Sequence, residues 1–331
     1  MTSTDKIPVT VLTGYLGAGK TTLLNRILTS PHDRKYAVIV NEFGEIGIDN
    51  ELVVDTDEEV FEMNNGCICC TVRGDLVRII GNLLNHKGRF DGILIETTGL
   101  ADPAPVAQTF FVDDELRGAV KLDSIVTVVD AKHLAARLQD SHEAAEQIAF
   151  ADTILLNKLD LVSPDDLVAT EARIRTINPT ATVHRTQSCA VPIEMVLDRR
   201  AFDLDRILAV EPDFLSGDDH QHDDAVTSVA FREERPIDIN KFNDWMGELL
   251  LTRGRDILRS KGILNLEGSP DRFIFQTVQM LTAGDDGKPW GRNEPRVSKI
   301  VFIGRNLDGA ELRAGFRSCV AGARRPPRTG R

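Results

Sequence analysis

Residues Gly14–Thr21 read GYLGAGKT and match the pattern G-x-x-x-x-G-K-[ST]. The apolar run Val9–Leu12 precedes them, and a helical pattern over Lys20–Leu28 follows. Glycines in this position let successive backbone N–H groups point at a phosphate, and the N-terminus of the helix adds its positive end. An isolated match would be an ordinary glycine-rich turn, but the flanking strand and helix predict a phosphate-binding loop.

Each part of this loop has an expected role. Lys20 places a positive charge between the β- and γ-phosphates of a nucleotide, and Thr21 offers a hydroxyl group to Mg²⁺. The backbone around them forms the cradle. The residues expected to contact the nucleotide here are Gly14, Gly17, Ala18, Gly19, Lys20, Thr21 and Thr22.

A second element supports the phosphate site. Gly92–Glu96 is an apolar strand that ends in an acid, and Thr97, Thr98 and Gly99 follow it. P-loop proteins hold Mg²⁺ with a carboxylate at the end of a neighbouring strand, directly or through water. We therefore predict that Glu96 acts with Lys20 in catalysis and that the Gly99 N–H contacts the γ-phosphate.

The tetrapeptide Asn157–Asp160, NKLD, follows the apolar run Thr153–Leu156. The Asp160 carboxylate can accept hydrogen bonds from guanine N1–H and the 2-amino group, whereas adenine would leave it unpaired. The stem of Lys158 can lie over the base, and Asn157 can brace the loop. Ser188 begins a further stretch whose backbone can contact guanine O6. These residues predict GTP or GDP as the nucleotide and GTP hydrolysis as the reaction.

Three cysteines fall within four residues in Gly66–Cys70, GCICC. The thiolates of Cys67, Cys69 and Cys70 can converge on a borderline cation such as Zn²⁺, or on Co²⁺ or Ni²⁺, and leave a position open for exchange. Glu42 or Glu45 is a candidate fourth ligand. Two alternatives remain open: buried structural cysteines and a redox pair formed by Cys67 and Cys70.

Short branched apolar runs alternate with helical patterns over the first two-thirds of the chain. The alternation predicts a doubly wound α/β sheet whose mostly parallel strands are buried on both faces. The expected strands are Val9–Leu12, Ala37–Val40, Gly92–Ile95, Ile125–Val129, Thr153–Leu156 and Val183–Thr186. The expected helices are Lys20–Leu28, Leu76–Leu84, Ala144–Phe150 and Pro164–Ile177.

The alternation ends at the acidic stretch 211–224, EPDFLSGDDHQHDD, which we interpret as a linker. We expect a P-loop GTPase domain over 1–210, a small α+β domain with an antiparallel sheet over 225–320, and a disordered tail over 321–331. In the second domain the expected strands are Val226–Phe231, Ile257–Leu266, Phe273–Leu281 and Ser298–Ile303, and the expected helices Ile239–Leu250 and Leu307–Cys319. His220 and His222 are more readily explained as solvated than as metal ligands.

The chain has 331 residues, 42% of them hydrophobic, and a net charge of −12. This charge argues against partners that favour a basic surface, namely nucleic acid and anionic membrane. There is no pattern of a signal peptide and no apolar run long enough to span a bilayer. The chain has five cysteines, an odd number, and three of them cluster in Cys67–Cys70. This pattern indicates reduced thiols instead of a disulfide framework, so a cytoplasmic protein is expected. A homodimer is left open.

Together these motifs resemble the CobW-like GTPases, relatives of the nickel-insertion GTPases of urease and hydrogenase. The resemblance rests on GYLGAGKTT (Gly14–Thr22), NEFGEIGID (Asn41–Asp49), GCICC, ETTG (Glu96–Gly99) and NKLD, and extends to RSKGIL (Arg259–Leu264) and FIFQ (Phe273–Gln276). It implies slow GTP hydrolysis, metal binding at the three cysteines, delivery of the metal to a client metalloprotein, nucleotide contacts near Cys70–Gly74 and a role for Asp49 in positioning the attacking water.

The chain departs from this family in two places. Only His220 and His222 stand where many members carry a long histidine-rich run, and Gln279 stands where histidine is common. These departures leave open whether the C-terminal half stores metal and whether the chain belongs to a zinc-specific branch of the family. Two other function classes compete with the metallochaperone: a P-loop phosphotransferase, and a non-catalytic thiol redox or zinc module.

Overall fold

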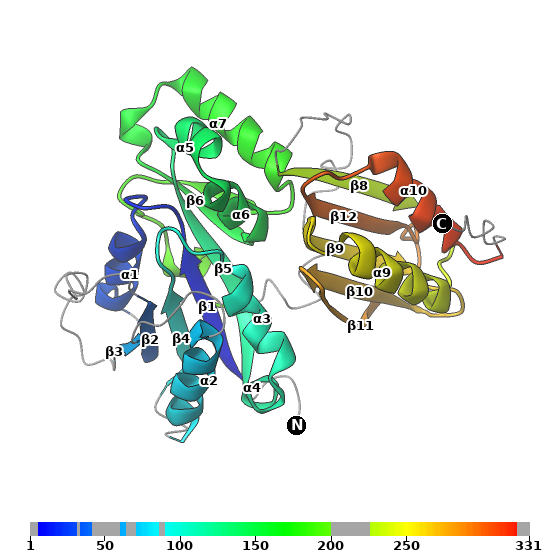
Figure 1. The fold of residues 1–331 in the computed structure, drawn as a ribbon, viewed down its shortest axis with the longest axis horizontal. Coiled ribbons are helices and arrows are strands. Elements are labelled where there is room, and N and C mark those ends of the chain that lie inside the picture. The colour runs from blue at the N-terminus through cyan, green and yellow to red at the C-terminus, as the bar shows by residue number, and fades with distance from the viewer. Residues whose placement is uncertain are drawn as a thin grey trace. The chain divides into compact units, whose positions relative to one another are not determined.

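The structure is a computed structural model that describes residues 6–31, 34–41, 60–63, 71–85, 90–199 and 226–322. The chain divides into two compact units, Met1–Phe202 and Asp203–Arg331. Each has its own sheet (Figure 1). Within the described residues, no helix is long and apolar enough to cross a membrane.

The first unit contains a seven-stranded sheet in the order β3-β2-β4-β1-β5-β6-β7, and every adjacent pair is parallel. The predicted α/β class is therefore confirmed. Its strands are β1 (Ile7–Thr13), β2 (Tyr36–Asn41), β3 (Val60–Met63), β4 (Gly92–Glu96), β5 (Val120–Asp130), β6 (Thr153–Asn157) and β7 (Thr182–Arg185). Its helices are α1 (Lys20–Thr29), α2 (Thr71–Leu84), α3 (Ala104–Val112), α4 (Asp114–Ala119), α5 (Leu134–Asp140), α6 (His142–Phe150) and α7 (Pro164–Ile177).

Both faces of the sheet are buried at its inner strands, so β4 and β6 are buried at every position instead of every second one. On one face, Leu24 of α1 packs in a core cluster with Leu94 of β4 and Val126 of β5. On the other face, the Thr127 hydroxyl donates a hydrogen bond of 2.7 Å to the carbonyl oxygen of Gln147 in α6. Adjacent residues of β5 therefore contact helices on opposite sides.

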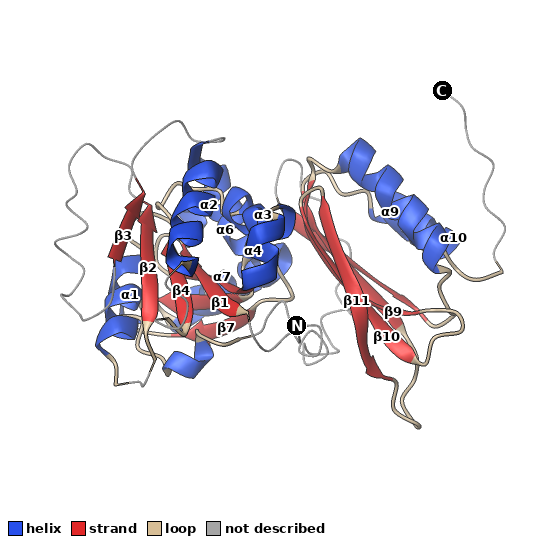
Figure 2. Cartoon of the chain, turned by 90° about the horizontal axis from the view of Figure 1, so that it is seen from below, coloured by secondary structure: helices blue, strands red, loops and turns tan. Residues whose placement is uncertain are grey.

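The second unit is an antiparallel five-stranded sheet in the order β11-β10-β9-β12-β8. Two helices, α9 and α10, lie on one face of it (Figure 2). Phe242 of α9 and Phe316 of α10 are buried there against strand residues such as Phe275 and Phe302. The elements are β8 (Thr227–Glu233), α9 (Ile239–Arg253), β9 (Ile257–Asn265), β10 (Asp271–Val278), β11 (Leu281–Pro289), β12 (Ser298–Gly304) and α10 (Gly309–Ser318).

The sequence reading was wrong at the β10–β11 hairpin. We expected one strand over Phe273–Leu281, but β10 ends at Val278 and the chain turns back. Gln279 adopts a left-handed backbone with φ of 51°, which makes the turn. The returning strand β11, LTAGDDGKP, has no alternation of apolar residues, because it is an exposed edge strand with little core to contact.

The core of the second unit gives a direct test of its packing. Leu249 and Leu251 lie on the same helix, α9, but Leu249 is 8% exposed and Leu251 is 82% exposed. We expect Leu249→Ala to lower the free energy of unfolding of this unit by about 2–5 kcal/mol, because it removes buried methyl groups and leaves a cavity. Leu251→Ala, the matched control, should change it by less than about 0.5 kcal/mol. Denaturant titrations measure both, and equal losses would contradict this packing.

Candidate nucleotide site

The carboxyl ends of four neighbouring parallel strands gather the predicted site residues. The register pairs Leu12 of β1 with Glu96 of β4, and Asp130 of β5 with Asn157 of β6. In an open parallel sheet, ligands bind outside this edge, at the point where successive connections turn in opposite directions. Here β1 lies between β4 and β5, so the loop that follows β1 occupies that point.

The loop Gly14–Thr21 has a backbone that requires glycine. Gly14, Gly17 and Gly19 all have positive φ angles, of 143°, 73° and 117°. A Cβ atom on Gly14 would lie 2.3 Å from the Val128 carbonyl oxygen, and one on Gly19 would lie 2.7 Å from Asn157 Nδ2. The loop therefore packs directly against β5 and β6. No side chain caps the start of α1, and the N-terminus of a helix favours a bound anion.

Thr21 and Glu96 form a pair of oxygen groups beside this loop. The Thr21 hydroxyl donates to Glu96 Oε1 at 3.0 Å, and Glu96 is only 6% exposed. A hydroxyl and a buried carboxylate are the ligands that Mg²⁺ takes when it also binds phosphate oxygens. These two residues therefore fit a Mg²⁺ site, and buried Lys20 begins α1 next to Thr21.

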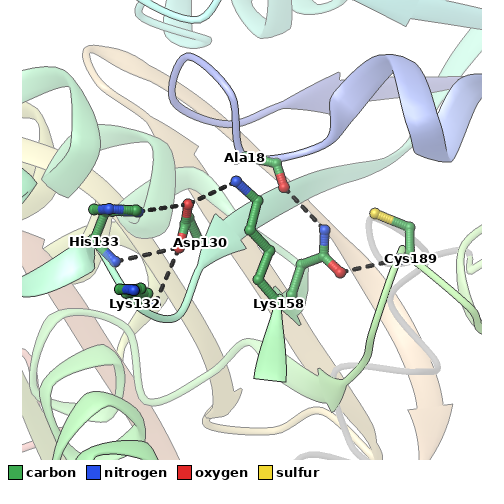
Figure 3. A network of polar contacts seen from close by, with 7 residues as sticks. Ala18, Asp130, Lys132, His133, Lys158 and Cys189 are labelled. Carbon is green, nitrogen blue, oxygen red and sulfur yellow. Dashed lines mark hydrogen bonds and ion pairs between the residues drawn. The ribbon is translucent and has the colours of Figure 1, made fainter. Parts of the chain in front are cut away.

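Asn157 joins the phosphate loop to two other segments. Its side chain, 2% exposed, donates from Nδ2 to the Ala18 carbonyl oxygen at 3.0 Å and accepts at Oδ1 from the Cys189 N–H at 3.0 Å (Figure 3). The Cys189 thiol in turn donates to the Gly19 carbonyl oxygen at 3.4 Å. Burial raises the pKa of this thiol to about 11, so it stays protonated and can keep that donor role at neutral pH.

The remaining predicted base-site residues follow β6 and β7. Lys158 has a left-handed backbone, with φ of 63°, and Asp160 is exposed in the short 3-10 helix Leu159–Leu161. Ser188 is also exposed and left-handed, with φ of 50°. Left-handed backbone costs roughly 1–2 kcal/mol in residues with a side chain. Cys189, next to Ser188, is left-handed as well, with φ of 54°. Three such residues on adjacent loops indicate that the site sets the backbone geometry.

Two contacts at this edge were not foreseen from the sequence. Asp130, at the end of β5, accepts a hydrogen bond of 2.8 Å from Lys158 Nζ. Gln147 of α6, 1% exposed, donates from Nε2 to the carbonyl oxygens of Gly99 and Ala101 at 3.1 and 3.2 Å. Gln147 thus holds the loop that carries Gly99. We refer to Asn157–Asp160 as the base loop. The sequence contained a usable signal for Asp130, an acid at the end of a neighbouring strand, whereas a single glutamine in a helix gives no such signal for Gln147.

A cavity of about 250 Å³ lies between the phosphate loop, the end of β5 and helices α5 and α6. Tyr15, Gly17, Asp130, Gln147 and Lys158 are among its lining residues. Gly99 lies close to the loop as well: a Cβ atom on it would be 2.7 Å from the Leu16 backbone nitrogen. The phosphate loop is therefore in contact with both the Gly99 loop and the base loop.

The predicted metal ligands Cys67, Cys69, Cys70 and Glu42, and also Asp49, His220 and His222, lie outside the described residues. Within the described ranges, no group of three or more His, Cys, Asp or Glu side chains is arranged to hold a metal ion. The strand ends that lead into these segments are described: Asn41 of β2 pairs with Met63 of β3, and Val40 pairs with Glu96.

Comparison with known proteins gives two family matches. Residues 8–185 match the CobW/HypB/UreG nucleotide-binding domain, and residues 226–320 match the cobalamin synthesis protein cobW C-terminal domain. The zinc chaperone YjiA of Escherichia coli is 38% identical over 94% of this chain and 98% of its own length. The zinc-regulated GTPase metalloprotein activator 1 of Schizosaccharomyces pombe is 34% identical over 92% of this chain and 83% of its own length.

A solved structure agrees with these matches. The crystal structure of the Zn(II)-bound YjiA GTPase from E. coli has a TM-score of 0.77 and 33% sequence identity, and it covers 95% of this chain and 99% of the other. The family expected from the motifs is confirmed, and the chain belongs to the CobW family of the CobW/HypB/UreG nucleotide-binding proteins.

Proposed function

We propose that this protein is a GTPase that binds zinc through its Cys67–Cys70 motif and delivers it to a client protein under the control of the bound nucleotide. The observation that carries the nucleotide part is the Asn157 bridge. It fixes the NKLD loop to the phosphate loop at Ala18, so one nucleotide can contact both. Relatives named as zinc chaperones and as zinc-regulated GTPases support the metal part.

The chain's own groups account for each part of GTP binding. The N–H groups of Gly14–Thr21 and the Lys20 ammonium would bind the phosphates. Thr21 and Glu96 would hold Mg²⁺, which neutralises charge on the phosphate oxygens when bound. Asp160 would select guanine through N1–H and the 2-amino group, and the Gly99 N–H would contact the γ-phosphate. Asp49 is proposed, from the family resemblance, to position the attacking water.

The strand topology supports a link between the nucleotide and the zinc ligands. Glu42 follows Asn41 directly, and Cys67 comes four residues after Met63. Asn41 and Met63 pair across β2 and β3, whose carboxyl ends lie at the same edge as Glu96. The two segments proposed to bind zinc therefore begin at adjacent strand ends on the nucleotide edge. In other P-loop switches, loss of the γ-phosphate releases segments near the nucleotide, and the same change here would alter the positions of the zinc ligands.

Guanine selection by Asp160 can be tested by replacing one of its carboxylate oxygens with an amide NH2 group. In Asp160→Asn the amide can donate to the 2-carbonyl oxygen of xanthine but cannot accept both guanine hydrogens. We expect GTP binding to weaken by about 10²-fold or more, because polar groups that become covered when the base binds are left unpaired. Binding of xanthosine triphosphate should improve. Equilibrium titrations with both nucleotides measure this.

Asp165→Asn is the matched control for that experiment. Asp165 is an exposed aspartate in the first turn of α7, five positions along the chain. It should leave the preference for GTP over xanthosine triphosphate unchanged. If Asp160→Asn also keeps the wild-type preference, Asp160 does not read the base and the proposed guanine specificity is wrong.

The zinc ligands are tested with Co²⁺, whose thiolate-to-metal absorption reports cysteine ligation. We expect this absorption in wild type carrying a non-hydrolysable GTP analogue. Cys67→Ser should weaken Co²⁺ binding by more than about ten-fold, because even changes outside the ligand shell can cost that much. The control is Cys319→Ser, a buried cysteine of the second unit. Unchanged absorption in Cys67→Ser would assign these thiols a structural or redox role instead.

A further inference from the structure

Asp130 is placed by the sheet beside the base loop. It is the last residue of β5 and pairs with Asn157, the last residue of β6. The Ala131 N–H donates to the Asn157 carbonyl oxygen at 3.0 Å, so the backbones of the two strand ends are joined. Asp130 therefore lies opposite Asn157, and Lys158 is the next residue after Asn157 in the chain.

The two carboxylate oxygens of Asp130 have different partners. Oδ1 accepts from the backbone N–H groups of Lys132 and His133 at 3.0 and 3.2 Å, which fixes the orientation of the group. Oδ2 accepts from Lys158 Nζ at 2.8 Å and contacts His133 Nδ1 at 2.9 Å (Figure 3). The turn after β5 thus presents one oxygen to the lysine.

The Asp130–Lys158 pair is partly shielded from water, with side chains 13% and 31% exposed. Burial alone would raise the pKa of Asp130, but hydrogen bonds from Lys158 and His133 outweigh it and hold the pKa below its usual value. The carboxylate is therefore charged at neutral pH. A shielded, charge-assisted hydrogen bond of this kind restrains a long side chain far better than an exposed ion pair does.

The hydrogen bond between Asp130 and Lys158 determines which part of the Lys158 side chain can contact a ligand. Its ammonium group is engaged by Asp130, and its side chain lines the cavity together with Tyr15, Leu16 and Gly17 of the phosphate loop. The part left for the nucleotide is the aliphatic stem, between the loop that carries Asp160 and the phosphate loop. A stem held at both ends loses little conformational entropy when a flat base packs on it.

We infer that Asp130 is a positioning residue for the guanine base: by holding Lys158 Nζ, it fixes the Lys158 stem as one wall of the base site. This inference rests on the proposed GTP binding. It adds to the base site a residue that lies outside the NKLD motif, at the end of β5. Asp130 acts through Lys158 and does not itself contact the nucleotide.

The test is a double-mutant cycle on GDP affinity with Asp130→Asn, Lys158→Met and the double variant. Asparagine keeps the shape of Asp130, and methionine keeps a stem without the ammonium group. We expect each single variant to weaken GDP binding by about ten-fold and the double variant to be no weaker than either, because both remove one interaction. Asp140→Asn, at the exposed end of α5, is the matched control and should bind GDP as wild type does.

A second readout separates positioning from base reading. Inosine diphosphate lacks the 2-amino group that Asp160 is proposed to bind. Asp130→Asn should weaken GDP and inosine diphosphate by the same factor and leave their ratio unchanged, whereas damage to the Asp160 loop would reduce that ratio. Additive losses in the cycle, or a changed ratio, would overturn the inference.

The outcomes distinguish this inference from the proposed function. If wild type does not bind GDP, the proposed GTPase activity fails and the inference fails with it. If wild type binds GDP but neither Asp130→Asn nor Lys158→Met changes its affinity, only the inference is overturned. Should Asp130→Asn fold poorly, Lys158→Met still decides the matter, because it leaves the partly shielded Asp130 carboxylate in place and keeps a stem of similar length, and wild-type affinity in that variant excludes a role for the Asp130–Lys158 hydrogen bond.

Discussion

The side chain of Asn157 is the contact on which the geometry of the site depends. It is buried at the end of β6, and it uses both the N–H and the oxygen of its amide to bind Ala18 and Cys189. An apolar residue here would leave a carbonyl and an N–H unsatisfied, at a cost of about 1–3 kcal/mol each. The phosphate loop, the base loop and the loop after β7 therefore have fixed positions relative to one another before any nucleotide binds.

Parallel strands extend this arrangement across the sheet. The carboxyl ends of these strands meet at one edge, and three contacts follow one another along it. They are Thr21 with Glu96, Gly99 with Gln147, and Lys158 with Asp130. The segments that carry Glu42 and the three cysteines leave from the same edge, at β2 and β3. Strands β2 and β3 thus join the nucleotide edge to the segments that are proposed to bind zinc.

Much of this was predictable because the motifs are local. The phosphate loop needs glycine at fixed spacings, and α7 begins and ends where its pattern indicates, with Ser163 capping its start. Long-range contacts left no such trace: Gln147 reaches Gly99 across 48 positions, and nothing near either residue predicts that pairing. The edge strand β11 was missed because its exposed residues are free of the alternation that burial imposes.

The proposed function requires that GTP hydrolysis releases zinc. The most direct measurement is a single turnover of the zinc-loaded protein with GTP, in which phosphate and zinc are followed together, each with its own fluorescent sensor. Zinc and phosphate should be released with the same rate constant, and a non-hydrolysable analogue should leave zinc bound. Zinc that stays bound through many turnovers, or that leaves equally fast with the analogue, would contradict the claim.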